Sequence, residues 1–185
     1  MAKFFDEIND KHREFIEAQK IFFTASAPLD AEGHVNLSPK GMDSFRVLSA
    51  TKVAYMDING SGNETSAHML ENGRVTMMFC AFDGPPNILR LYGKGYTVLP
   101  GHAEWNELSP LFHLPLAARQ IIVADVHKVQ TSCGFGIPYY DYKGERDQAI
   151  KWAESKGEEG IEKYQAEKNR ISMDGLPTAM FDGSN

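Results

Sequence analysis

The chain has 185 residues, of which 42% are hydrophobic and 24% charged, so it can form one domain with a buried core. Its formal net charge of −6 argues against a general nucleic-acid-binding protein, whose affinity comes from Lys and Arg neutralising phosphates. No apolar run approaches the roughly 20 residues of a membrane-spanning helix, the N-terminus lacks the pattern of a secretory signal, and Cys80 and Cys133 form no disulfide framework. We therefore expect a cytoplasmic protein without nucleic-acid or membrane partners.

The predicted elements begin with an amphipathic helix over residues 5–19, in which apolar side chains from Phe5 to Ile16 recur at helical spacing. Six strand-like runs follow, separated by turn sequences that contain Asp, Gly or Pro. These runs are residues 21–29, 34–41, 52–58, 74–82, 88–99 and 119–132. One short helix, residues 64–72, is inserted between the third and fourth runs.

The order of these runs indicates an antiparallel barrel. Because strands and helices do not alternate regularly, the pattern argues against a doubly wound parallel sheet. Closing a small antiparallel sheet also removes its exposed edges. Gly93 and Gly95 lie inside the fifth run, where glycine is typical of a bulge or a close approach of backbones. We therefore predict a mainly β, α+β fold with an N-terminal helix and one inserted helix.

From about residue 140 the sequence becomes charged and helical, with interruptions at Gly157 and Gly160. Trp152, Ile161 and Tyr164 are the candidates for the buried stripe of this region. We expect a helical extension that packs on the barrel rather than a separate domain.

The polar loop at residues 59–65, "NGSGNET", has two interpretations. In the first, Ser61 is the N-cap of the inserted helix and Glu64 is its partner three residues on, which together form a capping box. In the second, the same helix N-terminus offers free N–H groups and a positive dipole end to a phosphate. The neutral donors that would assist are Asn63, Thr65 and Ser66.

The loop itself contains no Lys or Arg, the usual strong partners of phosphate. Lys40, at the end of "NLSPK", would supply the missing cation if its strand end lay beside the loop. The alternative is that Lys40 is an exposed lysine at a strand end.

Three stretches together carry a family resemblance: "TASAPLDAEGHVNLSPKG", "YMDINGSGNETSAHMLENGRVTMMF" and "RLYGKG". Their order and spacing over residues 15–130 resemble the pyridoxamine 5′-phosphate oxidase-like flavoproteins, and most closely a subgroup known only as oxidase-related. The resemblance implies a six-stranded antiparallel split barrel of Greek-key topology that binds FMN in residues 1–135. Residues 136–185 would then be the helical extension packed on the barrel.

The resemblance also implies site residues. The family's second strand lines the flavin, and the loop before its inserted helix binds the FMN phosphate, in the oxidases proper with a Ser-Arg-Lys run. Here Asn63, Glu64 and Thr65 occupy that run, so its basic residues are missing and an acid is present. Arg90 matches a basic strand position and would supply charge, from its own or the partner subunit, unless it is a solvated strand residue. The positions that inherit cofactor binding are Asn36, Leu37, Ser38, Lys40, Asn63, Thr65, Ser66 and Arg90.

The resulting hypothesis is a homodimeric FMN-dependent oxidoreductase that acts on a small organic substrate. One alternative is a non-catalytic module of the same fold that binds flavin, haem or a deazaflavin. Another is a barrel that has lost its ligand, for which Glu64 is the best sign. The sequence assigns no catalytic residue, and its scattered histidines predict no metal site. Cys133 is either a small hydrophobe in a turn or a thiol facing the flavin.

Overall fold

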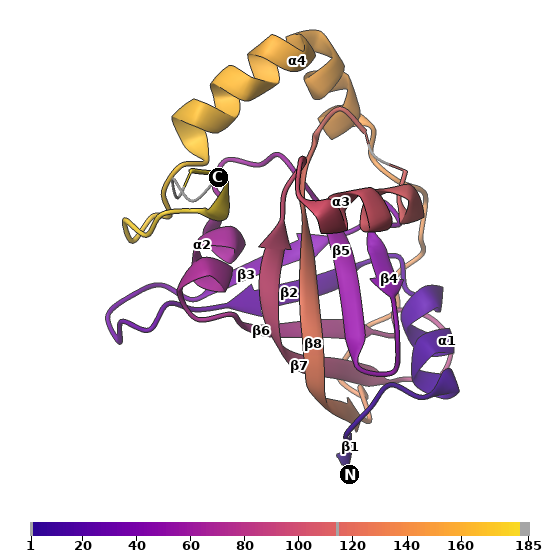
Figure 1. The fold of residues 1–185 in the computed structure, drawn as a ribbon. Helices are drawn as coiled ribbons and strands as arrows, with labels where there is room; N and C mark the ends of the chain where they lie inside the picture. The colour runs from indigo at the N-terminus through magenta and orange to yellow at the C-terminus, as the bar shows by residue number, and fades with distance from the viewer. Residues whose placement is uncertain (1, 114, 182–185) are drawn as a thin grey trace.

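Eight strands form one antiparallel sheet in the computed structural model, which describes residues 2–113 and 115–181 (Figure 1). Their order is β3-β2-β6-β7-β8-β5-β4, and β1 pairs with β8 off this path. The strands are β1 (Lys3–Phe5), β2 (Phe22–Ser26), β3 (Asn36–Lys40), β4 (Phe45–Val47), β5 (Lys52–Ile58), β6 (Arg74–Cys80), β7 (Ile88–Val98) and β8 (Ala118–Ser132). The helices are α1 (Asp10–Ala18), α2 (Glu64–Glu71), α3 (Ala103–Leu108) and α4 (Gln148–Lys168), with 3-10 turns η1 (Ser109–Leu111) and η2 (Ala179–Phe181).

The predicted antiparallel split barrel of the α+β class is confirmed, but the predicted number of six strands is wrong. All six predicted runs contain a strand. The two additional strands, β1 and β4, have three residues each, which is too short for a hydrophobic period to show. The first helix is also shorter than predicted. It begins at Asp10 because the Oδ1 atom of Asn9 accepts a hydrogen bond from the backbone N–H of His12 at 3.0 Å.

The sheet curls until its two ends approach each other. Phe22 of β2 and Phe45 of β4 stand near opposite ends of the strand order, yet their ring centroids are 4.9 Å apart. Phe45 also meets Phe79 of β6 at 4.9 Å. These rings belong to the main core, which fills the inside of the curl. The split of the barrel lies between β3 and β4, which stand at the two ends of the strand order and are joined in the chain by residues 41–44.

Residues outside the curl form a second apolar cluster. Leu108 at the end of α3 and Phe112 after it pack on Met56 of β5 and Ile121 of β8. As a result, the middle of β5 and the first half of β8 are buried on both faces. Such strands have continuous apolar runs rather than an alternating pattern.

The two strand glycines have the role that the sequence predicts. The pairing of β7 with β8 shifts register between Tyr92 and Gly93, as at a bulge. A Cβ atom on Gly93 would lie 2.6 Å from the carbonyl oxygen of Asp125, so the two backbones approach too closely for a side chain. A Cβ on Gly95 would lie 2.6 Å from the sulfur of Met69 in α2.

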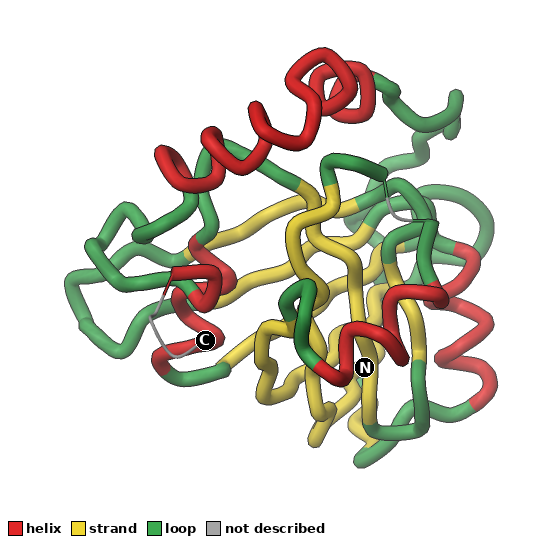
Figure 2. Tube along the Cα trace, turned by 45° about the horizontal axis from the view of Figure 1, so that its top comes forward, coloured by secondary structure: helices red, strands yellow, loops and turns green. Residues whose placement is uncertain are grey.

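The helix α4 crosses one end of the sheet, the end at which β5 passes into the loop before α2 (Figures 1 and 2). Gly157, with φ of 66° and ψ of 175°, interrupts it near the middle. Ala153 and Ile161 are buried in a small cluster with Ala117, and the rings of Trp152 and Tyr164 meet at 4.9 Å. A division of the chain into domains between residues 135 and 136 stays a prediction.

Candidate functional site

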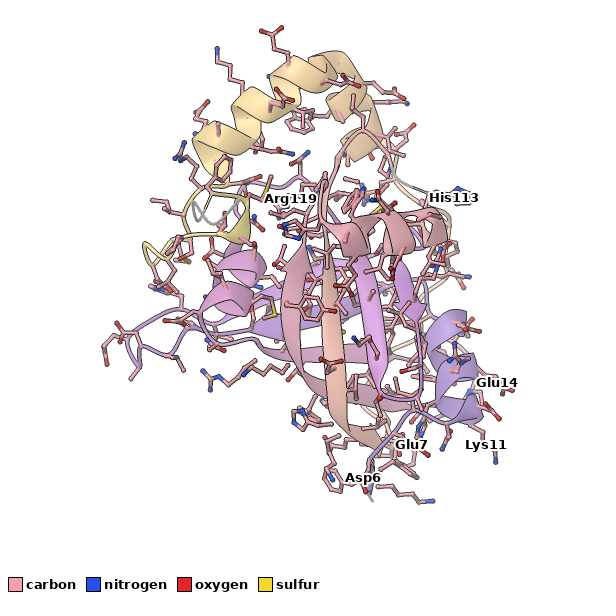
Figure 3. The ribbon with its side chains drawn as sticks, in the orientation of Figure 1. Asp6, Glu7, Lys11, Glu14, His113 and Arg119 are labelled. Atoms are coloured by element: carbon pink, nitrogen blue, oxygen red, sulfur yellow. The ribbon has the colours of Figure 1, made fainter. Side chains whose placement is uncertain are left out.

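A cavity of about 550 Å³ opens beside the split of the barrel. Its lining comes from β3 with Asn36, Ser38 and Lys40, the connection at residues 41–44, Met56 and Ile58 of β5, the loop at residues 59–62, and the start of α2 with Glu64 and Thr65. Arg119 at the beginning of β8 completes the wall. Figure 3 shows Arg119 at the end of the sheet near α4, far from Asp6 and Glu7 at the opposite end of the molecule. The cavity therefore joins the second predicted strand to the loop before the inserted helix.

Successive side chains of β3 point to opposite faces of the sheet, and this alternation determines which of them reach the cavity. Ser38 pairs with the fully buried Thr24 of β2, so Asn36, Ser38 and Lys40 point to the inside of the curl. Leu37 points the other way and is 63% exposed. Leu37 therefore does not line the cavity, although the family resemblance includes it among the cofactor-binding positions.

Lys40 is not an exposed lysine at a strand end. Only 18% of its side chain is accessible, and its Nζ atom lies 2.5 Å from Oδ1 of the buried Asp57. The other oxygen of Asp57 accepts hydrogen bonds from Nε of Arg119 at 2.9 Å and from Nε2 of Gln120 at 2.8 Å. Burial alone would raise the pKa of Asp57, but the charges of Arg119 and Lys40 outweigh burial and hold that pKa well below its ordinary value. The ionised form of Asp57 is therefore favoured in the folded protein.

Arg119 supplies a cation that the loop lacks. Its Nη1 atom donates to the carbonyl oxygen of Gly62 and to Oδ1 of Asn169, both at 2.9 Å. With the bond from Nε to Asp57, three of the five N–H donors of the guanidinium have partners. Within the described residues, no hydrogen bond from Nη2 to the protein is present. The two N–H groups on Nη2 can therefore meet a ligand in the cavity.

The predicted capping box is wrong. The N-cap of α2 is Asn63 rather than Ser61, and Glu64 is the first helical residue. The carboxylate of Glu64 accepts hydrogen bonds from the backbone N–H of Met173 at 3.1 and 3.2 Å. The side chain of Asn63 does not cap the helix, because its Oδ1 accepts from Nε2 of Gln120 at 2.7 Å. The carboxylate of Glu64 thus binds the C-terminal segment of the chain instead of capping its own helix.

Hydrogen bonds link three of the predicted residues into one polar wall. Nδ2 of Asn36 donates to Oγ1 of Thr65 at 3.0 Å, and Oγ of Ser38 donates to Oδ1 of Asn36 at 2.9 Å. Asn36 also contacts Ser26, which lies 2.9 Å from Nδ1 of the fully buried His68. Strand β3 and helix α2 are therefore fixed against each other at the cavity.

The structure places two further predicted residues away from this wall. Ser66 is buried, and its Oγ accepts from the backbone N–H of Ala179 at 3.1 Å. Arg90 lies on the outer face of the sheet, where its Nη1 atom is 3.4 Å from Oγ of Ser132. Cys133 is exposed and does not line the cavity.

The sequence prediction also missed Asp57, Arg119 and Gln120. Their signal was present, since each is a polar residue within or at the start of an otherwise apolar strand. A buried strand position of this kind needs a partner, because burying an unpaired charge is costly. What the sequence could not give is the pairing of Asp57 with Gln120 across β5 and β8, which brings the polar residues together.

A larger cavity of about 1040 Å³ adjoins the first and shares Gly41, Met42, Ser44 and Met56 with it. Aromatic residues of the core, Phe22, Phe45 and Phe79, form part of its wall. The buried Oγ of Ser44 has no hydrogen-bond partner in the described part of the chain. Non-glycine residues rarely adopt positive φ, yet Met42 and Asp43 do at this junction. Such backbone strain is common at functional sites.

In residues 2–113 and 115–181, no three His, Cys, Asp or Glu side chains are grouped so that they could hold a metal ion. The helices described there are also too short or too polar to cross a membrane.

Several solved structures share the fold. HupZ of group A Streptococcus superposes with a TM-score of 0.52 at 18% identity, over 66% of this chain and 91% of that one. A candidate pyridoxamine 5′-phosphate oxidase of Lactobacillus delbrueckii gives a TM-score of 0.52 at 12% identity, over 68% and 94% of the two chains. At these identities the likeness shows the fold alone.

Sequence comparisons identify the family. The chain is 39% identical, over 201 aligned positions, to the pyridoxamine 5′-phosphate oxidase family protein ustO of Aspergillus flavus, with 96% of this chain and 78% of that protein covered. The family model described as pyridoxamine 5′-phosphate oxidase matches residues 8–133, which contain β2 to β8 and the whole cavity wall named above. The chain therefore belongs to the pyridoxamine 5′-phosphate oxidase family.

Proposed function

We propose that the protein binds FMN and acts as an oxidoreductase on a small organic substrate. Family membership supports a flavin as the cofactor. The observation that carries the proposal is the cavity in which Lys40 and Arg119 meet the loop before α2. Neither cation is in the loop, so they would replace its missing basic residues from β3 and β8, two strands that are not adjacent in the sheet.

The groups around this cavity fit a phosphate monoester. Lys40 and Nη2 of Arg119 are cationic donors, and the hydroxyl of Thr65, which accepts from Asn36, can still donate as a neutral one. The first N–H groups of α2 have no partners within the helix and carry the positive end of its dipole. Two cations share the single carboxylate of Asp57, so this trio keeps one positive charge to attract an anion. The carboxylate of Glu64 also lines the cavity, but it accepts hydrogen bonds from the backbone N–H of Met173.

The protein would contribute binding, orientation and exclusion of water. Bound FMN would supply the electron-transfer chemistry. The ion pairs with Asp57 fix Lys40 and Arg119 before any ligand arrives, which lowers the entropy cost of binding. The adjoining cavity offers an aromatic and apolar wall next to the phosphate site, suited to a planar organic molecule.

We further infer a homodimer formed through the outer face of the sheet. Phe23 of β2 is paired with Met78 of β6, and Met78 with Arg90 of β7, so the three side chains lie side by side. All three are only partly buried in the isolated chain, and Leu37 next to them is well exposed. Apolar residues around an arginine are typical of an interface core. In this arrangement Arg90 would face the partner subunit.

The test is titration of the purified, flavin-free protein with FMN, riboflavin and FAD, followed by visible absorption and fluorescence. We expect FMN to bind, and to bind more tightly than riboflavin because of its phosphate. No uptake of any flavin would contradict the proposal. Uptake of FMN that neither NADH, NADPH nor a chemical donor can reduce would favour a binding module without turnover.

A further inference from the structure

The last turn of α4 contacts the loop before α2 directly. Gln165 and Asn169 are four residues apart, so their side chains lie on one face of the helix. Nε2 of Gln165 donates to Oδ1 of Asn59 at 2.9 Å, and Nδ2 of Asn169 donates to the carbonyl oxygen of Gly60 at 3.1 Å. Two side-chain amides from residues beyond the family match at 8–133 therefore hold the loop that lines the cavity.

Asn169 is the more constrained of the two amides. It is fully buried, and its Oδ1 accepts the hydrogen bond from Nη1 of Arg119 at 2.9 Å while its Nδ2 binds Gly60. Its backbone is fixed as well, because its carbonyl oxygen accepts from Oγ1 of the fully buried Thr178 at 2.7 Å. One side chain thus connects the cation on β8 to the glycine-rich loop.

This connection determines how Arg119 faces the cavity. Asp57, Gly62 and Asn169 take the Nε donor and both Nη1 donors of the planar guanidinium. The two donors on Nη2 are left for the cavity that Arg119 lines. Without Asn169, one Nη1 donor would lose its acceptor and the guanidinium could turn.

The same connection orients the loop. The carbonyl groups of Gly60 and Gly62 accept bonds from Asn169 and Arg119. In a trans peptide the N–H of the next residue points opposite to the carbonyl. The N–H groups of Ser61 and Asn63 are therefore directed away from these two side chains, and the N–H of Ser61, which lines the cavity, is available to an anion.

We propose that Asn169 is a positioning residue for phosphate recognition, which makes the site selective for a phosphorylated flavin over the unphosphorylated one. The proposal rests on the proposed function. Asn169 acts through Arg119 and the loop and need not touch the ligand. It follows that the C-terminal helix is part of the phosphate site rather than only a cover for the barrel.

The experiment compares Asn169→Leu and Asn169→Asp with a control, Lys163→Ala, at an exposed position of the same helix. Leucine has a similar volume but makes neither bond. Aspartate keeps an acceptor for Arg119 and loses the donor to Gly60, and it preserves a polar residue if leucine prevents folding. Dissociation constants are measured for FMN and riboflavin with each full-length variant, and hydrogen exchange is measured for the amides of residues 59–64 without ligand.

Asn169→Leu should lose about 10- to 100-fold in FMN affinity, as expected for a lost hydrogen bond to a charged group, and Asn169→Asp, which keeps the bond to Arg119 and loses only the bond to Gly60, should lose a smaller factor. Their riboflavin affinity should change by less than about threefold, and their loop amides should exchange faster than those of Lys163→Ala. An unchanged ratio of FMN to riboflavin affinity would overturn the proposal while the proposed function stands. If the wild-type protein takes up no FMN, the proposed function fails. In that case the exchange measurement still tests Asn169. If the amides of residues 59–64 exchange at the same rate in Asn169→Leu, Asn169→Asp and the wild type, the positioning role of Asn169 is overturned independently.

Discussion

Two side chains of the candidate site, Lys40 and Thr65, give the first prediction at the scale of residues. Lys40→Ala removes a cation from the cavity and Thr65→Ala removes a hydroxyl. Each should weaken FMN binding by roughly 1–3 kcal/mol if the lost bond is charge-assisted or well buried. Titration by flavin fluorescence measures the effect. Lys94→Ala, at an exposed lysine of β7, is the matched control and should bind FMN like the wild type. Wild-type affinity in both site variants would refute this placement of the phosphate.

Asp57 gives a prediction about pH. Its pKa is held below the ordinary value of about 3.9, so its contribution to folding stability is present above that pH and is lost as pH falls toward the lower folded-state pKa. Asp57→Asn should therefore flatten the acid limb of the stability curve. At neutral pH it should cost about 3–5 kcal/mol, because Lys40 and Arg119 lose their shared carboxylate. Chemical unfolding between pH 3 and 7 provides the measurement.

FMN should stabilise Asp57→Asn more than it stabilises the wild type, since the phosphate would then be the only anion that pairs both cations. Thermal unfolding with saturating FMN tests this. An equal or smaller shift in Tm would indicate that the phosphate does not approach Lys40 and Arg119.

At the scale of elements, the interruption of α4 at Gly157 can be tested separately. With φ of 66° and ψ of 175°, this residue occupies a region that is essentially restricted to glycine. Gly157→Ala should cost about 1–3 kcal/mol, although an added Cβ meets nothing within 4 Å. Gly136→Ala, which also meets nothing within 4 Å and has no positive φ, should be close to neutral. Equal stability of the two variants would show that α4 tolerates another backbone path.

The elements also show what the sequence can predict. The six longer strands and the inserted helix are predictable because their apolar runs and turn residues are local signals. The start of the inserted helix at residue 64 was predicted correctly, but its N-cap was misplaced, because a Ser-x-x-Glu spacing indicates a capping box only when nothing else takes the glutamate. Here the backbone of Met173, which is 109 residues away in the sequence, binds Glu64. The contacts of Arg119 with Asp57 and Asn169 are non-local in the same way, 62 and 50 residues apart.

At the scale of the whole molecule, the outer sheet face predicts the oligomeric state. Met78→Lys places a charge in the middle of the proposed interface, between Phe23 and Arg90. We expect light scattering after size-exclusion chromatography to show a dimer for the wild type and a monomer for the variant, since an unpaired charge in a buried interface core is costly. Thr97→Lys, on a half-buried position of β7 outside this face, is the control. A variant that remains dimeric would exclude this face as the interface.

The central claim is that the phosphate of FMN binds where Lys40, Arg119 and the start of α2 surround the smaller cavity. A crystal structure of the protein with FMN is the most direct measurement. The account predicts phosphate oxygens within hydrogen-bond distance of Nζ of Lys40 and Nη2 of Arg119. A phosphate bound elsewhere, with only water between these two side chains, would contradict it.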